Sequence, residues 1–296
     1  MATITPSITH TTATSPTKPI PPSIQSAQPI IPSYISSCIG AAAGVCEIGI
    51  QQPTIAIKNA IQTGRSIPWS PSELYRGVTI NMLSIAPITG TQFTVNNILT
   101  AQFISSHTHQ LTSIQQILFS SVAGGVSGLI SGPAELILIQ QQQTGYTLLQ
   151  QLQYITTHHS NALYRRGLIS AVTRDGLFTC GYLGLTPVLQ SYITKSPYSS
   201  TNNTVNNIVG SLLAGISIGI LSHPIDTIKT KIQSTLVYQH NGYNTMLQSI
   251  YTTIQHDSVR SLFNGLLPRT IRICGATFII SEVNKLLTKQ YIDRIA

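Results

Sequence analysis

Three stretches of the chain superimpose without gaps and share the same spacing of glycine, proline and glutamine. They read GVCEIGIQQPTIAIKNAIQ, GGVSGLISGPAELILIQQQ and GISIGILSHPIDTIKTKIQ. In each, glycine lies nine residues before the proline and glutamine nine residues after it: Gly44, Pro53 and Gln62; Gly124, Pro133 and Gln142; Gly215, Pro224 and Gln233. Because self-similarity of this kind is the signature of a repeat architecture, the stretches predict three copies of one structural unit.

Each copy continues with a second shared element, which reads LYRGVTINML, YRRGLISAVTRD or LFNGLLPRTIRI. These elements predict a second helix in each unit, opening after Gly77, Gly167 and Gly265. The proline removes one backbone hydrogen bond from the first helix of each unit, so we expect a bend there. The sequence therefore predicts an all-α fold of three two-helix repeats around a pseudo-threefold axis.

The repeat boundaries follow from these alignments. We expect a disordered tail rich in Ser, Thr and Pro at 1–30, and repeats at 31–110, 111–200 and 201–296. The tail lacks the Arg-rich amphipathic pattern of a transit peptide and the apolar core of a secretory signal. Any targeting information is therefore expected in the body of the chain.

Charged residues make up only 8% of the chain, against about 25% in an ordinary soluble domain. So few charges leave a water-facing surface poorly solvated. Ser, Thr and Gly dilute the apolar segments, as close helix packing in lipid favours. We therefore predict six transmembrane helices, each long enough for about 30 Å of hydrocarbon. They lie at about 34–60, 78–98, 116–142, 168–193, 206–233 and 266–288.

The loops after the first, third and fifth predicted helices hold most of the loop Lys and Arg residues, whereas the opposite loops carry only Lys195. The first set should face the more negative compartment. The net charge is +8, but there is no run of three basic residues and no nucleic-acid motif, so no nucleic-acid partner is expected. Without metal-ligand spacing, a phosphate loop or a nucleophile with a base, we expect neither a metal or other cofactor nor enzymatic activity.

The proline motifs resemble those of the mitochondrial carrier family, which carries Px[DE]xx[KR] in each repeat. The third copy, PIDTIK, is complete; the first, PTIAIK, lacks the acid, and the second, PAELIL, lacks the base. The resemblance covers about residues 34–290. It implies the carrier fold of six transmembrane helices in three repeats.

The resemblance also implies a gate on the matrix side, where the acid of one repeat pairs with the base of the next. Glu135 would then pair with Lys229, and Asp226 with Lys58. Ile55 and Leu138 take the remaining places, so losing both partners leaves no orphan charge. In the family a glutamine braces each pair, which implies this role for Gln62, Gln142 and Gln233. A cytosolic gate is implied on the second helices, where only Glu282 and Lys285 keep their charges.

The family's substrate contacts lie seven residues after the glycine that opens each second helix. This implies contacts at Ser84, at Arg174 with the adjacent Asp175, and at Arg272. Both arginines can form forked hydrogen bonds with a carboxylate, and Asp175 can balance an ammonium group. Alternatively, either member of the Arg174–Asp175 pair is neutralised by another helix.

Two further charges fall within the predicted transmembrane helices. Glu47 lies six residues before Pro53, and a charged group at that depth is by default functional. We consider it a substrate-site residue that binds a cation or a proton. Arg269 lies one turn from Arg272 and faces either lipid headgroups or the matrix gate.

These residues predict transport of a small amino-acid-like zwitterion, such as an amino acid, carnitine or S-adenosylmethionine, by alternating access. The resemblance places the protein in the mitochondrial inner membrane, as a multi-pass monomer that binds cardiolipin. Two alternatives remain: a keto-acid, dicarboxylate or nucleotide carrier, and a carrier-like scaffold that does not transport. Whether the carrier works by exchange or uniport, and whether it couples to protons, stays open.

Overall fold

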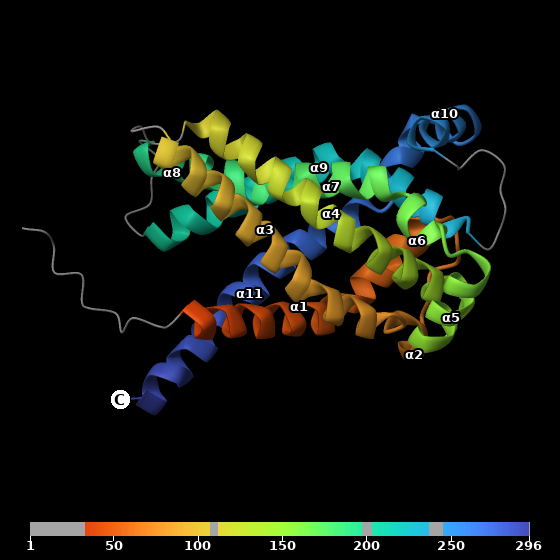
Figure 1. Cartoon of the computed structure of the whole chain (residues 1–296), viewed down its shortest axis with the longest axis horizontal. Helices are drawn as coiled ribbons and strands as arrows, with labels where there is room; N and C mark the ends of the chain where they lie inside the picture. Colours follow the sequence, from red (N-terminus) through yellow and green to blue (C-terminus); the bar gives the residue numbers. More distant parts are fainter. Residues whose placement is uncertain (1–32, 107–111, 197–202, 237–244, 296) are drawn as a thin grey trace, which may run out of the picture.

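The computed structural model describes residues 33–106, 112–196, 203–236 and 245–295, and these residues form helices without any β-strand. The tail at 1–30 lies outside the described residues. Five long helices and one interrupted helix account for most of the fold (Figure 1). They are α1 (Ser33–Gln62), α3 (Val78–Ser106), α4 (Ser113–Thr144), α7 (Leu168–Thr179) continued by η1 (Cys180–Leu185) and α8 (Thr186–Lys195), α9 (Asn203–Ser234) and α11 (Leu266–Ile295).

Shorter helices follow the first long helix of each repeat, that is, α1, α4 and α9. They are α2 (Pro71–Leu74), α5 (Leu148–His158), α6 (Ala162–Arg165), α10 (Met246–His256) and η2 (Val259–Phe263). In the second and third repeats this connection holds an 11-residue helix, but α2 has only 4 residues. The first connection is the shortest of the three in sequence, and it has no room for a helix of that length.

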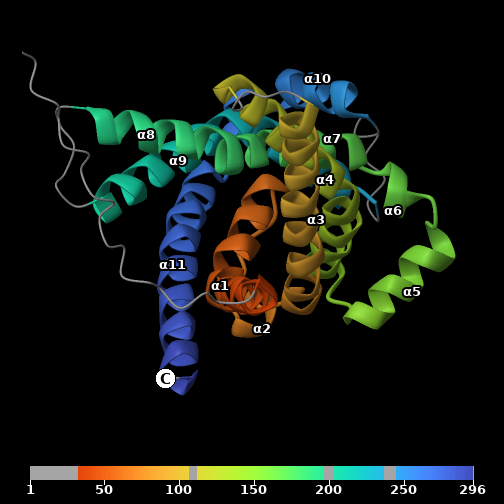
Figure 2. The ribbon, with the colours of Figure 1, turned by 60° about the vertical axis from the view of Figure 1, so that its left-hand side comes forward.

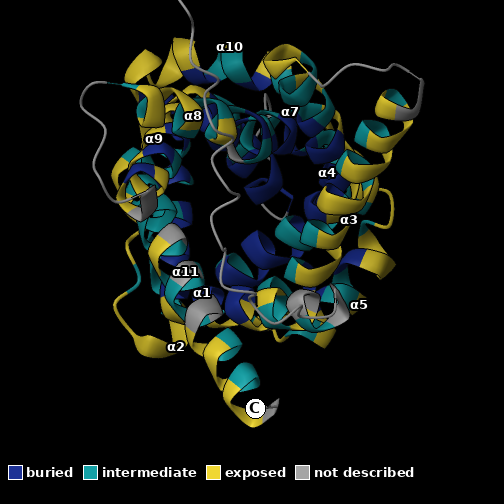
Figure 3. Cartoon of the chain, turned by 90° about the vertical axis from the view of Figure 1, so that its left-hand side faces the viewer, coloured by how far each residue is buried: buried dark blue, intermediate teal, exposed yellow. Residues whose placement is uncertain are grey.

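The long helices form a closed ring. Going around it, α1 packs on α3, α3 on α4, α4 on α7, α8 on α9, α9 on α11, and α11 again on α1. Figure 3 shows buried residues lining the inside of this ring and exposed residues covering its outside. The order agrees with three consecutive two-helix units.

The helices are long enough to cross a bilayer, because 30 residues span about 45 Å at 1.5 Å per residue. Two of them also contain an 18-residue stretch with the hydropathy typical of membrane crossing, with a mean hydropathy of 1.6 in α4 and 1.8 in the Val205–Ser234 part of α9. The others are diluted with polar residues. Hydropathy alone therefore indicates two crossing helices, and the count of six stays a prediction.

Pro53, Pro133 and Pro224 all lie inside helices, in α1, α4 and α9. A helix can hold such a proline when it bends and gives up one hydrogen bond. Figure 2 shows α1 changing direction between its red N-terminal part and its orange C-terminal part. The predicted bend is therefore visible in this helix.

Helices α4 and α7 approach each other through glycines one turn apart. A Cβ at Gly124 would clash with the backbone oxygen of Asp175, and a Cβ at Gly128 would lie 2.6 Å from Cα of Val172. From the other side, Gly176 faces the backbone oxygen of Ser121. Small residues let helix backbones come this close. The glycines of α4 and α7 therefore allow direct backbone contact between these two helices.

The second helix of each repeat begins at a glycine in the left-handed conformation, with φ of 84° at Gly77, 74° at Gly167 and 81° at Gly265. Each of these glycines packs on the first helix of the next repeat: Gly77 faces Leu138, Gly167 faces Gln233, and Gly265 faces Lys58 and Gln62. The three contacts follow one another cyclically. These glycine contacts support the expected pseudo-threefold arrangement, and they are independent of the proline motif.

We expect Gly77→Ala to destabilise the protein more than Gly64→Ala does. Both glycines have positive φ, 84° and 68°, and alanine pays about 1–3 kcal/mol in such a conformation. Gly64 has open space around it, whereas a Cβ at Gly77 would also clash with Cδ1 of Leu138. Thermal unfolding of both variants in the same detergent measures the difference, and equal midpoints would contradict the packing at Gly77.

Candidate functional site

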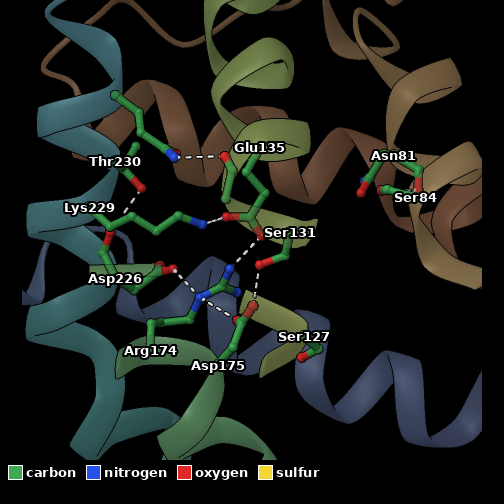
Figure 4. A network of polar contacts seen from close by, with 12 residues as sticks. Asn81, Ser84, Ser127, Ser131, Glu135, Arg174, Asp175, Asp226, Lys229 and Thr230 are labelled. Atoms are coloured by element: carbon green, nitrogen blue, oxygen red, sulfur yellow. Dashed lines mark hydrogen bonds and ion pairs between the residues drawn. The ribbon is translucent and has the colours of Figure 1, made fainter. Parts of the chain in front are cut away.

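Ionisable side chains meet inside the ring, on helices α1, α4, α7, α9 and α11. Figure 4 shows the centre of this group, with Arg174 pointing toward carboxylates from three helices. Among the described residues, we define the interior charge cluster as the acids Glu47, Glu135, Asp175 and Asp226 and the bases Lys58, Arg174, Lys229, Arg269 and Arg272. With every group ionised the cluster carries one more positive than negative charge.

Asp226 has the most partners in the cluster. Its carboxylate accepts a hydrogen bond from Nζ of Lys58 at 2.8 Å and lies 3.2 Å from Nη1 of Arg269 and 3.9 Å from Nε of Arg174. The amide of Gln62 donates to the same carboxylate at 3.1 Å. The structure therefore brings together the first expected gate pair and its glutamine, and it adds two arginines to them.

The second expected pair, Glu135 and Lys229, is also in contact, and Arg174 donates from Nη2 to Glu135 at 2.5 Å. In the described hydrogen bonds, the amide of Gln233 donates to the backbone oxygen of Gly132 at 3.0 Å and not to either member of this pair. Glu135 is therefore held by two cations from different helices, α7 and α9. Gln233 therefore binds the backbone of α4, about one helical turn from Glu135.

The third gate position is apolar and buried. Ile55 and Leu138 are each 4% exposed. Beside them, Asn59 donates to Oε1 of Gln142 at 2.8 Å, and Arg65 donates to the backbone oxygen of Gln142. The contact between the first two repeats therefore uses hydrogen bonds where the other contacts use ion pairs.

Arg174 and Asp175 lie side by side on α7 but have different partners. Nε of Arg174 is 2.9 Å from Asp175, and the same guanidinium reaches Glu135 and Asp226. Asp175 is 5% exposed and accepts a hydrogen bond from the hydroxyl of Ser131 on α4. Both residues face inward, and in this conformation both are neutralised by the protein itself.

Arg272 is the most accessible base in the cluster. Its side chain is 36% exposed, against 14% for Arg174 and 8% for Arg269. Its partner is Glu47 on α1, with Nε and Oε1 3.8 Å apart. That distance leaves the guanidinium largely free to bind another carboxylate.

The remaining predicted site residues lie outside this network. Ser84 on α3 is buried, its hydroxyl donates to the backbone oxygen of Asn81, and Figure 4 shows it apart from the ion pairs. Glu282 is partly buried on α11, and the side chain of Lys285 lies outside the described residues. The expected cytosolic gate therefore stays a prediction.

The sequence interpretation missed a polar position shared by all three repeats. Two residues before each proline stand Gln51, Ser131 and Ser222, and each of them hydrogen-bonds a charged residue of the cluster. Gln51 donates to Glu47, Ser131 donates to Asp175, and Ser222 accepts from Arg269. Aligning the repeats on their prolines could have revealed this position, because all three side chains are polar.

Comparison with known proteins gives a family match and several distant relatives. The family model described as "Mitochondrial carrier protein" matches residues 200–293. The chain is 26% identical to a probable mitochondrial 2-oxodicarboxylate carrier of Dictyostelium discoideum, over 94% of this chain and 96% of the relative. It is 25% identical to mitochondrial 2-oxodicarboxylate carrier 2 of Saccharomyces cerevisiae, over 83% and 89%. It is 24% identical to mitochondrial citrate transporter D of Aspergillus niger, over 79% and 86%.

Proposed function

Because this chain is a divergent member of the mitochondrial carrier family, and so a solute transporter rather than an enzyme, we propose that its solute is a 2-oxodicarboxylate. The proposal replaces the amino-acid-like zwitterion that the sequence alone favoured, which is not confirmed. Relatives named for 2-oxodicarboxylates and citrate support the dicarboxylate alternative better. The interior charge cluster gives independent physical support.

The observation that carries this proposal is the excess of accessible positive charge inside the ring. The cluster holds five bases and four acids, and the ion pair of its most exposed base, Arg272, among the described residues is with Glu47 at 3.8 Å. A guanidinium binds a carboxylate through two parallel hydrogen bonds. Arg272 on α11 would hold one carboxylate of the solute, and Arg174 on α7 would hold the other.

The surroundings of Asp175 disfavour a zwitterion. An ammonium group would need a free carboxylate, and Asp175 already accepts from Ser131 and pairs with Arg174. Glu135 and Asp226 are likewise held by two or more cations. A second carboxylate on the solute therefore fits this interior better than an ammonium group does.

The same contacts suggest how binding would open a gate. A solute carboxylate that takes Nη2 of Arg174 removes one of the two cations that hold Glu135. The same guanidinium lies 3.9 Å from Asp226 on α9, so turning it toward the solute also removes an ion pair between the second and third repeats. The solute drives the change only by the difference between its affinities for the two states. We accordingly propose Glu135, Lys229, Asp226 and Lys58 as the matrix gate.

We further propose a multi-pass location in the mitochondrial inner membrane, as the names of the relatives suggest. We also propose that the chain consists of three repeats, works as a monomer and binds cardiolipin. The amides at the helix starts after Gly77, Gly167 and Gly265 are suited to lipid phosphates.

Uptake into liposomes by the purified protein tests the solute. We expect labelled 2-oxodicarboxylates to enter faster than citrate, amino acids, carnitine, S-adenosylmethionine or nucleotides in a panel measured side by side. Faster entry of an amino acid would restore the zwitterion hypothesis. Absence of entry for the whole panel would favour a scaffold that does not transport.

A further inference from the structure

Glu47 is a buried acid to which the proposed transport mechanism gives no part. It lies on α1, is 4% exposed, and accepts a hydrogen bond from the amide of Gln51 at 2.9 Å. Its nearest cation is Arg272, 3.8 Å away on α11. A buried carboxylate of this kind stays ionised only while a counter-charge compensates for its lost hydration.

Among the described side chains of the helices packed around Glu47, no second cation pairs with it. Helix α3 carries no Asp, Glu, Lys, Arg or His. On α9, His223 contacts the backbone oxygen of Asn264, while Asp226 and Lys229 pair with Lys58 and Glu135. On α11, Arg269 binds Asp226 and Ser222. Arg272 is therefore the one cation of the interior charge cluster that pairs with Glu47.

The other acids of the cluster are protected against the loss of one partner. Glu135 would keep Lys229 if Arg174 turned away, and Asp226 would keep Lys58 and Arg269. Asp175 would keep the hydroxyl of Ser131. Only Glu47 depends on a cation that is also the most accessible site for a solute carboxylate.

We propose that Glu47 takes up one proton when a dicarboxylate binds Arg272, so that the dianion and the proton are bound and carried together. This inference rests on the proposed function. When the solute carboxylate takes the guanidinium, Glu47 loses its counter-charge inside the protein, and binding a proton removes the uncompensated charge. Gln51 suits both forms, because its amide can donate to the carboxylate or accept from the carboxylic acid.

The charges balance at each step. The solution that supplies the dianion also supplies the proton, which binds a carboxylate oxygen of Glu47. After the ring opens to the other side, the solute leaves, Arg272 pairs again with Glu47, and the proton is released there. Each passage of one dianion in either direction then carries one proton with it, so the exchange of one dicarboxylate for another moves no net proton.

The pH dependence of substrate affinity tests the inference. If one proton binds with each dianion, linkage requires the half-saturating concentration to rise about tenfold per pH unit. We expect this rise for wild-type exchange in liposomes at two pH values one unit apart near neutrality, with the same pH on both sides. In Glu47→Gln the rise should fall below about twofold, whatever rate remains, because Gln cannot take up a proton.

Three further variants complete the experiment. Glu135→Gln makes the same chemical change in the same cluster and should keep the wild-type pH dependence, and Glu47→Asp should keep it as well. If the dependence vanishes in Asp175→Asn and persists in Glu47→Gln, the proton binds elsewhere and the inference is wrong. Counting protons taken up from weakly buffered detergent solution when 2-oxoglutarate binds gives a second measurement on the wild type alone.

The outcomes separate this inference from the proposed function. Dicarboxylate transport with a half-saturating concentration independent of pH would overturn the proton coupling and leave the solute intact. Absence of dicarboxylate transport in the wild type would overturn both. Proton uptake that survives unchanged in Glu47→Gln would overturn the assignment to Glu47.

Discussion

Replacing Arg272 with alanine is expected to lower dicarboxylate uptake about 100-fold or more while changing the thermal unfolding midpoint little. A forked pair of charge-assisted hydrogen bonds, each contributing about 1.5–3 kcal/mol, accounts for a loss of this size. Stability should change little because Arg272 is 36% exposed and lies 3.8 Å from Glu47, its ion-pair partner among the described residues, and because Glu47 can bind a proton once the guanidinium is gone. Initial rates of uptake into liposomes and thermal unfolding in detergent measure the two effects.

Two substitutions serve as controls for this prediction. Arg272→Lys keeps the charge but loses the fork, so it should restore uptake only in part. Arg260→Ala removes an exposed arginine of η2, outside the ring, and should leave uptake unchanged. Wild-type uptake in Arg272→Ala would show that the solute does not bind at this guanidinium and would contradict the proposed site.

Replacing Asp226 with asparagine is expected to cause the largest loss of stability among single changes in the cluster. The change leaves Lys58 and Arg269 buried without the carboxylate that lies 2.8 Å and 3.2 Å from them. Removing one partner of a buried ion pair costs about 3–5 kcal/mol, because the other charge stays uncompensated. Thermal unfolding of the purified variant in detergent measures the loss.

The chain provides a matched control for Asp226→Asn. Asp257 pairs with Lys231 at 2.7 Å but is 45% exposed, and exposed pairs contribute about 0–1 kcal/mol. Asp257→Asn should therefore lower the unfolding midpoint only slightly. Lys58→Leu should fall between the two, because Asp226 would keep Arg269. Equal midpoints for Asp226→Asn and Asp257→Asn would contradict the account of the buried network.

The repeat register predicted much of the fold. Aligning the prolines predicted the helices that hold Pro53, Pro133 and Pro224, and the contacts of Glu135 with Lys229 and of Asp226 with Lys58 are present. Counting from the glycines placed Arg174 and Arg272 on inward-facing positions. The repeat alignment needs only the period of a helix and the order of the repeats, whereas the gate pairs and the count from the glycines were implied by the resemblance to the carrier family.

The partners of each inward residue could not be predicted in the same way. Arg269 on Asp226, and Asp175 on Ser131, depend on side chains of separate helices meeting across the ring. The expectation that Asp175 balances an ammonium group stays a prediction; in this structure its carboxylate accepts from Ser131 and lies 2.9 Å from Nε of Arg174. Sequence spacing predicts which face of a helix a residue lies on, but it does not predict which of several neighbouring side chains pairs with that residue.

A π-helical turn also limits what counting can predict. The segment Cys180–Leu185 interrupts the second helix of repeat two between α7 and α8. Each residue inserted into an α-helix rotates all later positions by about 100°. Faces assigned beyond Leu185 by counting from Gly167 are therefore displaced, whereas Arg174 and Asp175 lie before the interruption and keep their predicted orientation.

The close approach of α4 and α7 at Gly124 and Gly128 has a mechanical consequence. Glu135 and Ser131 lie on one of these helices and Arg174 and Asp175 on the other, so backbones in contact hold all four on a single rigid body. Lys229, on α9, lies across a joint from them. When a bound solute displaces Arg174, we therefore expect Glu135 to move with it. The relative movement is then largest where these two helices contact α9.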